Sequence, residues 1–292
     1  MSKLYRDRTW NQTLYEAGIE QQQSRFNTEL RRAVFRKWLA TDSYSYLSFI
    51  QSLAQNDFKV NVEALSPIEQ KQLLMFYYDL FENAGYYHHL QNMVDELSAD
   101  PYFCAEVKEV ITLLLQDSKA YEKPDNSMLP DFPLKLHGVY TKAQIQVAIG
   151  TSTLERKSPS REGVERNKAL RLEAMFVDII KNREEGSTTD YDDKALSPYL
   201  FQWDTQNRVK PESDEGKAYI NQTQTMLLFV REQKNFVEDK SRTMGYVYLG
   251  RVTLHQWEYK NLGVRKQMQI VWNMIEPIPG SVMHFARIKE IA

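Results

Sequence analysis

The distribution of glycine divides this 292-residue chain into two parts that favour different folds. Of its 11 glycines, only Gly18 and Gly85 lie in the first 135 residues. Long amphipathic runs with few glycines are typical of helices, whereas short apolar runs separated by turn residues are typical of strands. Three prolines between residues 124 and 133 have the composition of a connector. The sequence therefore predicts a helical domain over 1–135 and a β-rich domain over 136–292.

The first part carries signals for the starts and faces of helices. Between residues 24 and 40, Phe26, Leu30, Val34 and Trp38 recur every four positions, which places them on one helical face. Serine or aspartate, followed in two cases by proline, marks the starts of further helices. The expected helices are 24–40, one capped by Ser43, one that begins at Ser66-Pro67, 85–97, and 103–117 with Asp100-Pro101 opening it.

The second part changes to the pattern of strands. Thr141 is expected to cap a short helix over 142–149, and four β-branched or aromatic runs follow it. These runs predict strands at 174–181, 226–233, 246–252 and 268–275. Four strands are too few for either a barrel or a sandwich, so further strands are expected within 184–223 and 253–266. The fold class is α+β, with a helical bundle followed by a mixed, mainly antiparallel β domain.

Composition excludes several classes of protein. The content of 42% hydrophobic and 26% charged residues is that of a globular chain and excludes a disordered one. Cys104 is the single cysteine, which excludes a disulfide framework and a cysteine-based zinc site. No apolar run approaches the 18 residues of a membrane span, and the N-terminal residues have no signal-like apolar region. A soluble, cytoplasmic protein without membrane contact is expected.

The net charge of −2 hides an uneven distribution of charge. The first 135 residues hold 14 Lys and Arg against 19 Asp and Glu, a balance of −5, so the remaining 23 and 20 give +3. Seven basic residues against three acidic ones give the segment 141–171 a net charge of +4. Such a segment suits contacts to nucleic-acid phosphates, although an ordinary solvated surface explains it equally well.

Sequence motifs for catalysis are missing. The chain holds no phosphate-binding loop, no dinucleotide fingerprint, no nucleophile elbow and no zinc-protease motif. The His88-His89 pair lacks a carboxylate partner at ligand spacing, and Cys104 lies in an apolar helical pattern that favours a buried, inert thiol. An enzyme acting on nucleic acid through Asp192, Asp193 and Glu232 ranks last among the hypotheses. No enzymatic activity and no cofactor are predicted.

Several ordered motifs resemble one uncharacterised family. They are Pro133-Leu134-Lys135-Leu136-His137 with Tyr140-Thr141, Arg161-Glu162-Gly163-Val164, Ser197 to Trp203 with Gln206-Asn207, Leu227 to Glu232, Tyr248-Leu249-Gly250, and Trp272 to Pro279. This set is similar to the C-terminal domain attached to superfamily-two DNA helicases of bacterial restriction and phage-defence enzymes. In type IV restriction enzymes of this architecture, a phospholipase-D-like nuclease and a helicase precede that domain.

The resemblance implies a DNA-reading β-barrel similar to SRA and PUA domains, which recognises modified cytosine by base flipping. The implied base-pocket residues are Tyr191, Asp193, Ser197, Phe201, Trp203, Asp204, Gln206 and Asn207. The implied contacts to the DNA backbone are Lys142, Arg161, Arg166, Lys168 and Arg231. Double-stranded DNA and helicase or nuclease subunits are the expected partners, and a homodimer is left open. The competing hypothesis is a scaffold that docks a defence nuclease or helicase, with Trp203 in an interface or in the core.

Overall fold

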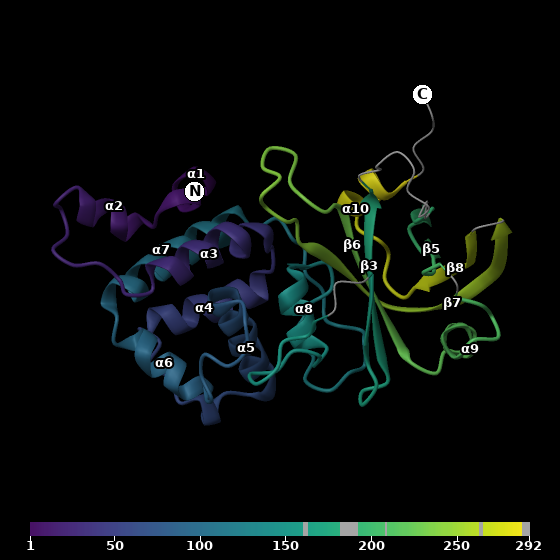
Figure 1. The fold of residues 1–292 in the computed structure, drawn as a ribbon, viewed down its shortest axis with the longest axis horizontal. Coiled ribbons are helices and arrows are strands. Elements are labelled where there is room, and N and C mark those ends of the chain that lie inside the picture. Colours follow the sequence, from purple (N-terminus) through teal and green to yellow (C-terminus); the bar gives the residue numbers. More distant parts are fainter. Residues whose placement is uncertain (160–162, 182–191, 208, 263–264, 288–292) are drawn as a thin grey trace. The chain divides into compact units, whose positions relative to one another are not determined.

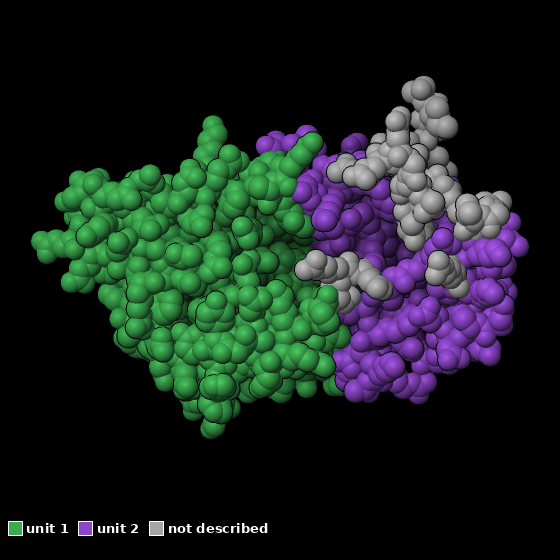
Figure 2. Space-filling view, viewed as in Figure 1, with its two compact units in different colours: residues 1–123, 129–159, 239–245 green, residues 124–128, 160–238, 246–292 purple. Residues whose placement is uncertain are grey.

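The computed structural model describes residues 1–159, 163–181, 192–207, 209–262 and 265–287. Their contacts divide the chain into two compact units, coloured separately in Figure 2. Unit 1 comprises residues 1–123, 129–159 and 239–245, and unit 2 comprises residues 124–128, 160–238 and 246–292. The helical unit therefore includes residues on the far side of the predicted boundary at 135/136.

Unit 1 consists mainly of helices. In chain order they are α1 (Ser2–Asp7), α2 (Trp10–Glu16), α3 (Asn27–Arg36), η1 (Trp38–Ala40), α4 (Tyr44–Gln55), η2 (Val62–Ala64), α5 (Pro67–Phe81), α6 (Leu90–Ser98), α7 (Pro101–Asp117) and α8 (Lys142–Ala148). The short strand β1 (Val139–Tyr140) precedes α8, and its Val139 forms an antiparallel bridge with Asp42. Figure 1 shows these helices in purple to teal.

Local capping chemistry explains where these helices begin. The Ser66 and Thr141 side chains each accept a hydrogen bond from the third helical residue, and each cap is closed by a side chain that returns to the cap backbone. Ser43 and Asp100 cap α4 and α7 by the same kind of acceptor bond. The predicted helix starts at these four residues are confirmed, because capping depends on residues only three positions apart.

A buried carboxylate lies at the centre of unit 1. Asp79 on α5 is fully buried and accepts hydrogen bonds from Trp38 Nε1 at 3.0 Å, Tyr46 Oη at 2.7 Å and Gln144 Nε2 at 2.9 Å. Its donors come from η1, α4 and α8, so one side chain links four elements. Burial raises the pKa of the Asp79 carboxyl to about 6, while the hydrogen bonds from Tyr46 and Gln144 favour the charged form.

Unit 2 contains one mixed sheet with two short helices. The strands are β2 (Val164–Asn167), β3 (Leu172–Ile180), β4 (Lys194–Ser197), β5 (Leu200–Asp204), β6 (Thr225–Gln233), β7 (Tyr246–Leu262) and β8 (Arg265–Met274), and the helices are α9 (Asp214–Asn221) and α10 (Gly280–Ala286). Their order in the sheet is β2-β3-β6-β7-β8-β5-β4. β3 and β6 are parallel, and the other neighbours in this order are antiparallel.

The predicted α+β class with N-terminal helices is confirmed, but the predicted closed barrel is wrong. The sheet is open, with β2 at one edge and β4 at the other. Both edge strands have four residues, a length that offers few unpaired backbone groups. A bulge at Leu249, where Leu228 pairs with Gly250 and Phe229 with Tyr248, disrupts the β6–β7 ladder, and Gly250 has the positive φ of +91° that favours glycine.

Of the strands that the sequence left unassigned, β4 and β5 lie within one of the two segments where further strands were expected, whereas β1 and β2 lie outside both. The segment 184–223 contains β4, β5 and α9, and 253–266 contains the second half of β7 and the start of β8. β3 and β6 are parallel neighbours, so the chain between them must cross over the sheet, and it does so through β4, β5 and α9.

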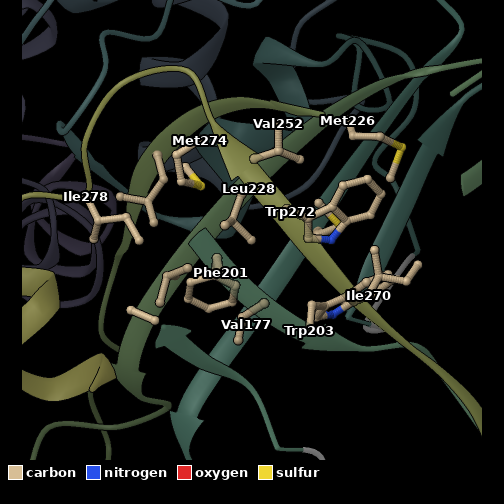
Figure 3. Packing of buried hydrophobic residues seen from close by; sticks show 14 of the residues in the cluster. Val177, Phe201, Trp203, Met226, Leu228, Val252, Ile270, Trp272, Met274 and Ile278 are labelled. Atoms are coloured by element: carbon tan, nitrogen blue, oxygen red, sulfur yellow. The ribbon is translucent and has the colours of Figure 1, made fainter. Parts of the chain in front are cut away.

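The core of unit 2 lies on one face of this sheet and is largely aromatic and aliphatic. Figure 3 shows Phe201, Trp203, Ile270 and Trp272 pointing into it together with Val177 and other apolar side chains. Within the described part of the chain, no helix is long and apolar enough to span a membrane.

Candidate nucleic-acid interface

Two of the three aromatic residues predicted for the base pocket, Phe201 and Trp203, are core residues. Phe201 is fully buried, and Trp203 is 4% exposed. Trp203 packs edge-on against Tyr219, with ring centroids 5.5 Å apart, and lies 6.3 Å from Trp272 at an angle of 35°. The sequence left a base pocket, an interface and the core open for Trp203, and the structure shows it in the core (Figure 3). Stacking on a base would require these rings to leave their packing.

The polar residues predicted for the same pocket lie on the other face of the sheet. Side chains alternate along a strand, so Gln202 and Asp204 point away from the core that holds Phe201 and Trp203. Asp204 pairs in register with Gln269 of β8, whose Nε2 donates to Asp204 Oδ1 at 2.9 Å. We call the buried polar residues of β5 and β8 on this side the polar face; its members are Gln202, Asp204, Gln267 and Gln269.

Asp193 and the preceding Asp192 are joined to the polar face by hydrogen bonds with Asp204. The Asp204 backbone N–H donates to Asp193 Oδ1 at 2.8 Å, and the Asp192 N–H donates to Asp204 Oδ2 at 2.8 Å. Burial raises the pKa of the Asp193 carboxyl, although the Lys181 ammonium at 2.7 Å opposes that shift. Gln202 Nε2 donates to the Asp192 carbonyl at 2.7 Å. The structure thus brings together two of the predicted pocket residues, Asp193 and Asp204.

The remaining predicted pocket residues lie near the two ends of β5. Ser197 Oγ accepts from the Tyr199 N–H at 3.2 Å in the turn before β5. Beyond its other end, Asn207 Oδ1 accepts from the Lys266 N–H at 3.1 Å, and the half-buried Gln206 precedes it. Tyr191 lies outside the described residues. These contacts hold backbone in place and are separated by the length of the strand.

Two of the predicted phosphate-binding arginines are held in ion pairs. Arg166 contacts Glu173 through Nε and Glu215 through Nη1, the latter at 2.8 Å. Arg231 pairs in register with Asp178 of β3, with Nε 2.7 Å from Oδ1, and its guanidinium lies 4.1 Å from the centre of the Tyr246 ring. A cation already neutralised by a carboxylate attracts a phosphate less strongly.

The other predicted cations that the structure describes belong to different units. Lys142 is the first residue of α8 in unit 1, whereas Lys168 is exposed in the turn between β2 and β3 of unit 2. Arg161 lies outside the described residues. The basic segment 141–171 is therefore divided between the two units.

Sequence reasoning assigned no functional residue to the second half of β7 or to the start of β8. There Trp257 is 40% exposed, and Lys266 and Asn261 are also exposed. The signal was the run His-Gln-Trp-Glu-Tyr-Lys at 255–260, in which aromatic and polar residues alternate as in a strand. Across the described residues, no group of three or more His, Cys, Asp or Glu is placed to hold a metal ion.

Fold and candidate site together define an α+β protein with N-terminal helices and an open mixed sheet, one side of which carries buried amides and carboxylates. Within this class, the chain belongs to the family described as a domain of unknown function (DUF3427), whose sequence model matches residues 134–285. That match covers the whole described sheet of unit 2. The comparison with curated proteins finds no match.

Proposed function

We propose that this chain is a non-catalytic DNA-binding module that recognises modified cytosine by base flipping. In this proposal it is the C-terminal part, or a partner, of a restriction or anti-phage helicase-nuclease. The observation that supports it best is the polar face, where Asp204, Gln202 and Gln269 are buried on a sheet that already has a complete core on its other side.

Buried polar side chains are informative because they contribute less to folding than apolar ones of the same size. Carboxylates accept hydrogen bonds from the cytosine N4 amine, and amides read base edges through paired donor and acceptor atoms. Here Gln269 Nε2 and Gln202 Nε2 donate to Asp204 and Asp192, which fixes the orientation of both amides. A preorganised array of this kind is what recognition of a base edge requires.

The positions of Phe201 and Trp203 restrict the mechanism. Both rings belong to the core, so hydrogen bonding must contribute more to base recognition than stacking by these two residues. A single 5-methyl carbon adds only about 1 kcal/mol of apolar contact. Unstacking a base costs a few kcal/mol, so we expect modest discrimination between methylated and unmodified duplex.

A protein-docking scaffold is the second candidate, and one observation favours it. Leu196, Tyr199 and Ile275 are 40%, 54% and 45% exposed. Tyr199 and Ile275 lie close together because the Met274 N–H donates to the Tyr199 carbonyl at 2.9 Å. Exposed apolar side chains that gather at one place often mark contacts with another protein.

The test is a fluorescence-anisotropy titration of the full chain with cytosine, methylcytosine and hydroxymethylcytosine duplexes at two salt concentrations. We expect affinity to fall with salt, because binding releases counterions, and to be higher for a modified duplex. Asp204→Asn replaces an acceptor oxygen with a donor amide and should reduce that preference, whereas Asp214→Asn on the exposed start of α9 should leave it unchanged.

Three results would reject parts of the proposal. Absence of binding to any duplex at low salt would reject the DNA-binding module and favour the scaffold. Equal affinity for all three duplexes would reject recognition of the modification. Divalent-metal-dependent cleavage of DNA by the chain alone would reject its non-catalytic character.

A further inference from the structure

An open cavity lies on unit 1, between residues 60–63 and the first turn of α6. Its volume is about 770 Å³, within the range of sites that bind small ligands. The lining residues are 60–63, 88–92 and Leu154, and all of them belong to unit 1. They include the His88-His89 pair, for which neither the fold nor the proposed function accounts.

Gln91 holds two walls of this cavity against each other. Its Oε1 accepts from the Val62 N–H at 2.9 Å, and its Nε2 donates to the Val60 carbonyl at 3.0 Å. The apolar side chains of Val60, Val62, Leu90 and Leu154 are half-buried in the lining. A wall that is already fixed binds a ligand without the entropic cost of ordering the protein.

Several polar side chains of the lining have no role in the fold. Among the residues that the structure describes, no hydrogen bond or ion pair reaches the side chains of Glu63, His88, His89 and Asn92. A carboxylate only accepts hydrogen bonds, and a neutral imidazole has one acceptor nitrogen, so the cavity suits a ligand that donates. The described residues place no group of three or more His, Cys, Asp or Glu to hold a metal ion, which leaves an organic donor.

Charge at the cavity favours a cationic donor. Apart from the two histidines, Glu63 is the one side chain of the lining that carries a charge. Gln91 Nε2 also donates to Asp95 Oδ1 at 2.8 Å, which places a second carboxylate beside the lining. Lys59, which precedes the lining segment, already lies 3.7 Å from Asp57. Carboxylates without a cation of their own attract an ammonium or guanidinium group.

The segment beyond Leu154 does not reverse this balance. Glu155 offsets the neighbouring Arg156 in charge. The Lys157 ammonium contacts Asn83 Oδ1 at 3.4 Å, and neither residue belongs to the lining. Glu63 therefore sets the sign of the charge at the cavity.

We infer that this cavity binds a lysine or arginine side chain presented by a segment of a partner polypeptide. The methylene stem of such a side chain packs against the valine and leucine walls, and its charged end donates to Glu63 and to an imidazole. Tyr86, two residues before His88, is 58% exposed, and tyrosine is enriched where proteins bind each other. The inference goes beyond the proposed function, because it concerns the helical unit and not the sheet of unit 2.

The test follows the histidine signals of the full chain by NMR. The chain holds five histidines, so His88→Gln and His89→Gln variants assign the two imidazole signals of the cavity. The probes are the acetylated and amidated tripeptides Leu-Lys-Leu, Leu-Arg-Leu, Leu-Gln-Leu and Leu-Glu-Leu. The lysine and arginine peptides are expected to shift both signals and to bind about tenfold more tightly than the other two.

Substitutions of Glu63 test its role directly. Glu63→Gln keeps the size of the side chain and is expected to weaken binding of the lysine peptide about tenfold, whereas Glu63→Lys should reverse the preference in favour of the glutamate peptide. Glu63 is exposed, so thermal unfolding of both variants should match that of the unmodified protein. The matched control is Glu109→Gln, at an exposed position of α7 outside the lining, which should bind within about twofold of the unmodified protein.

Four results would overturn the inference. They are equal affinity for the lysine and glutamine peptides, no shift of either histidine signal with any peptide at millimolar concentration, an equal loss for Glu63→Gln and Glu109→Gln, and a stronger response to a single-stranded oligonucleotide or to free spermidine than to the lysine peptide. The last result would assign the cavity to nucleic acid or to a free amine. Glu63→Gln should bind duplex DNA as the unmodified protein does, so this inference and the proposed function fail separately.

Discussion

Trp203 and Asp204 are consecutive residues of β5 whose side chains lie on opposite faces of the sheet. Trp203 packs against Tyr219 and Trp272 in the core, and Asp204 accepts from Gln269 on the polar face. The aromatic and polar halves of the predicted base pocket are therefore separated by the strand itself. Any DNA contact at Asp204 is made without the ring beside it in the sequence.

Replacing Trp203 tests its place in the core. Trp203→Ala removes a buried indole and is expected to lower the free energy of unfolding by about 3–5 kcal/mol. Trp257→Ala, the same change at a ring that is 40% exposed, should cost less than about 1 kcal/mol. Chemical denaturation followed by circular dichroism measures both. Equal stability of the Trp203 variant and the unmodified protein would contradict the core position.

Replacing Asp204 tests the polar face. Asp204→Ala removes the buried carboxylate that accepts hydrogen bonds from Gln269 Nε2 and the Asp192 N–H. The loss of this acceptor should lower the free energy of unfolding by about 1–3 kcal/mol. Glu258→Ala on β7, which β8 separates from β5, removes an exposed carboxylate and should change stability by less than about 0.5 kcal/mol. If urea denaturation shows no change in the free energy of unfolding for Asp204→Ala, water satisfies these donors and the site is open to solvent.

Short-range signals made much of the fold predictable. Helix starts at Ser43, Ser66, Asp100 and Thr141 depend on atoms three residues apart, and the sequence contains that information directly. By contrast, β5 was expected only as a strand somewhere within 184–223, and the face that it turns toward the core was not predicted. That choice depends on Tyr219 and Trp272, which are distant in the chain.

Long-range pairing accounts for what the sequence did not predict. The open sheet follows from the parallel pairing of β3 with β6 and from the hairpins at its two edges. The ion pair of Arg231 depends on Asp178, 53 positions away, so an isolated sequence segment presents this arginine as a free cation. A positive segment is thus weak support for DNA contact until the partners of its cations are known.

The buried carboxyl of Asp79 makes stability depend on pH. Burial raises the pKa of this carboxyl to about 6 in the folded state, above its ordinary value of 3.8, so the folded state binds more protons than the unfolded state between these values. The contribution of Asp79 to the free energy of unfolding therefore falls as the pH rises from about 4 to about 6, and it stays constant above that range. Relative to Asp79→Asn, which does not titrate, the unmodified protein should lose about 3 kcal/mol over that range.

Urea denaturation at pH 4, 5, 6 and 7 measures this difference. Taking the difference between the two proteins removes the effect of other groups whose pKa is raised, such as Glu106. A difference that stays constant, or that grows in favour of the unmodified protein with rising pH, would show that the Asp79 carboxyl remains ionised throughout.

Two glycines provide a matched pair that tests how closely the segment 239–245 packs within unit 1. A Cβ at Gly245 would lie 2.2 Å from the Ala40 carbonyl oxygen, and the nearby Arg242 donates to the Leu39 carbonyl at 3.2 Å. Gly245→Ala must therefore displace backbone and is expected to lower the free energy of unfolding by about 1–3 kcal/mol. Gly280→Ala, at the start of α10, meets nothing within 4 Å and should be neutral or slightly stabilising, because alanine favours a helix. Thermal unfolding measures the melting temperatures of both variants. Equal melting temperatures would show that residues 239–245 separate readily from α3 and η1.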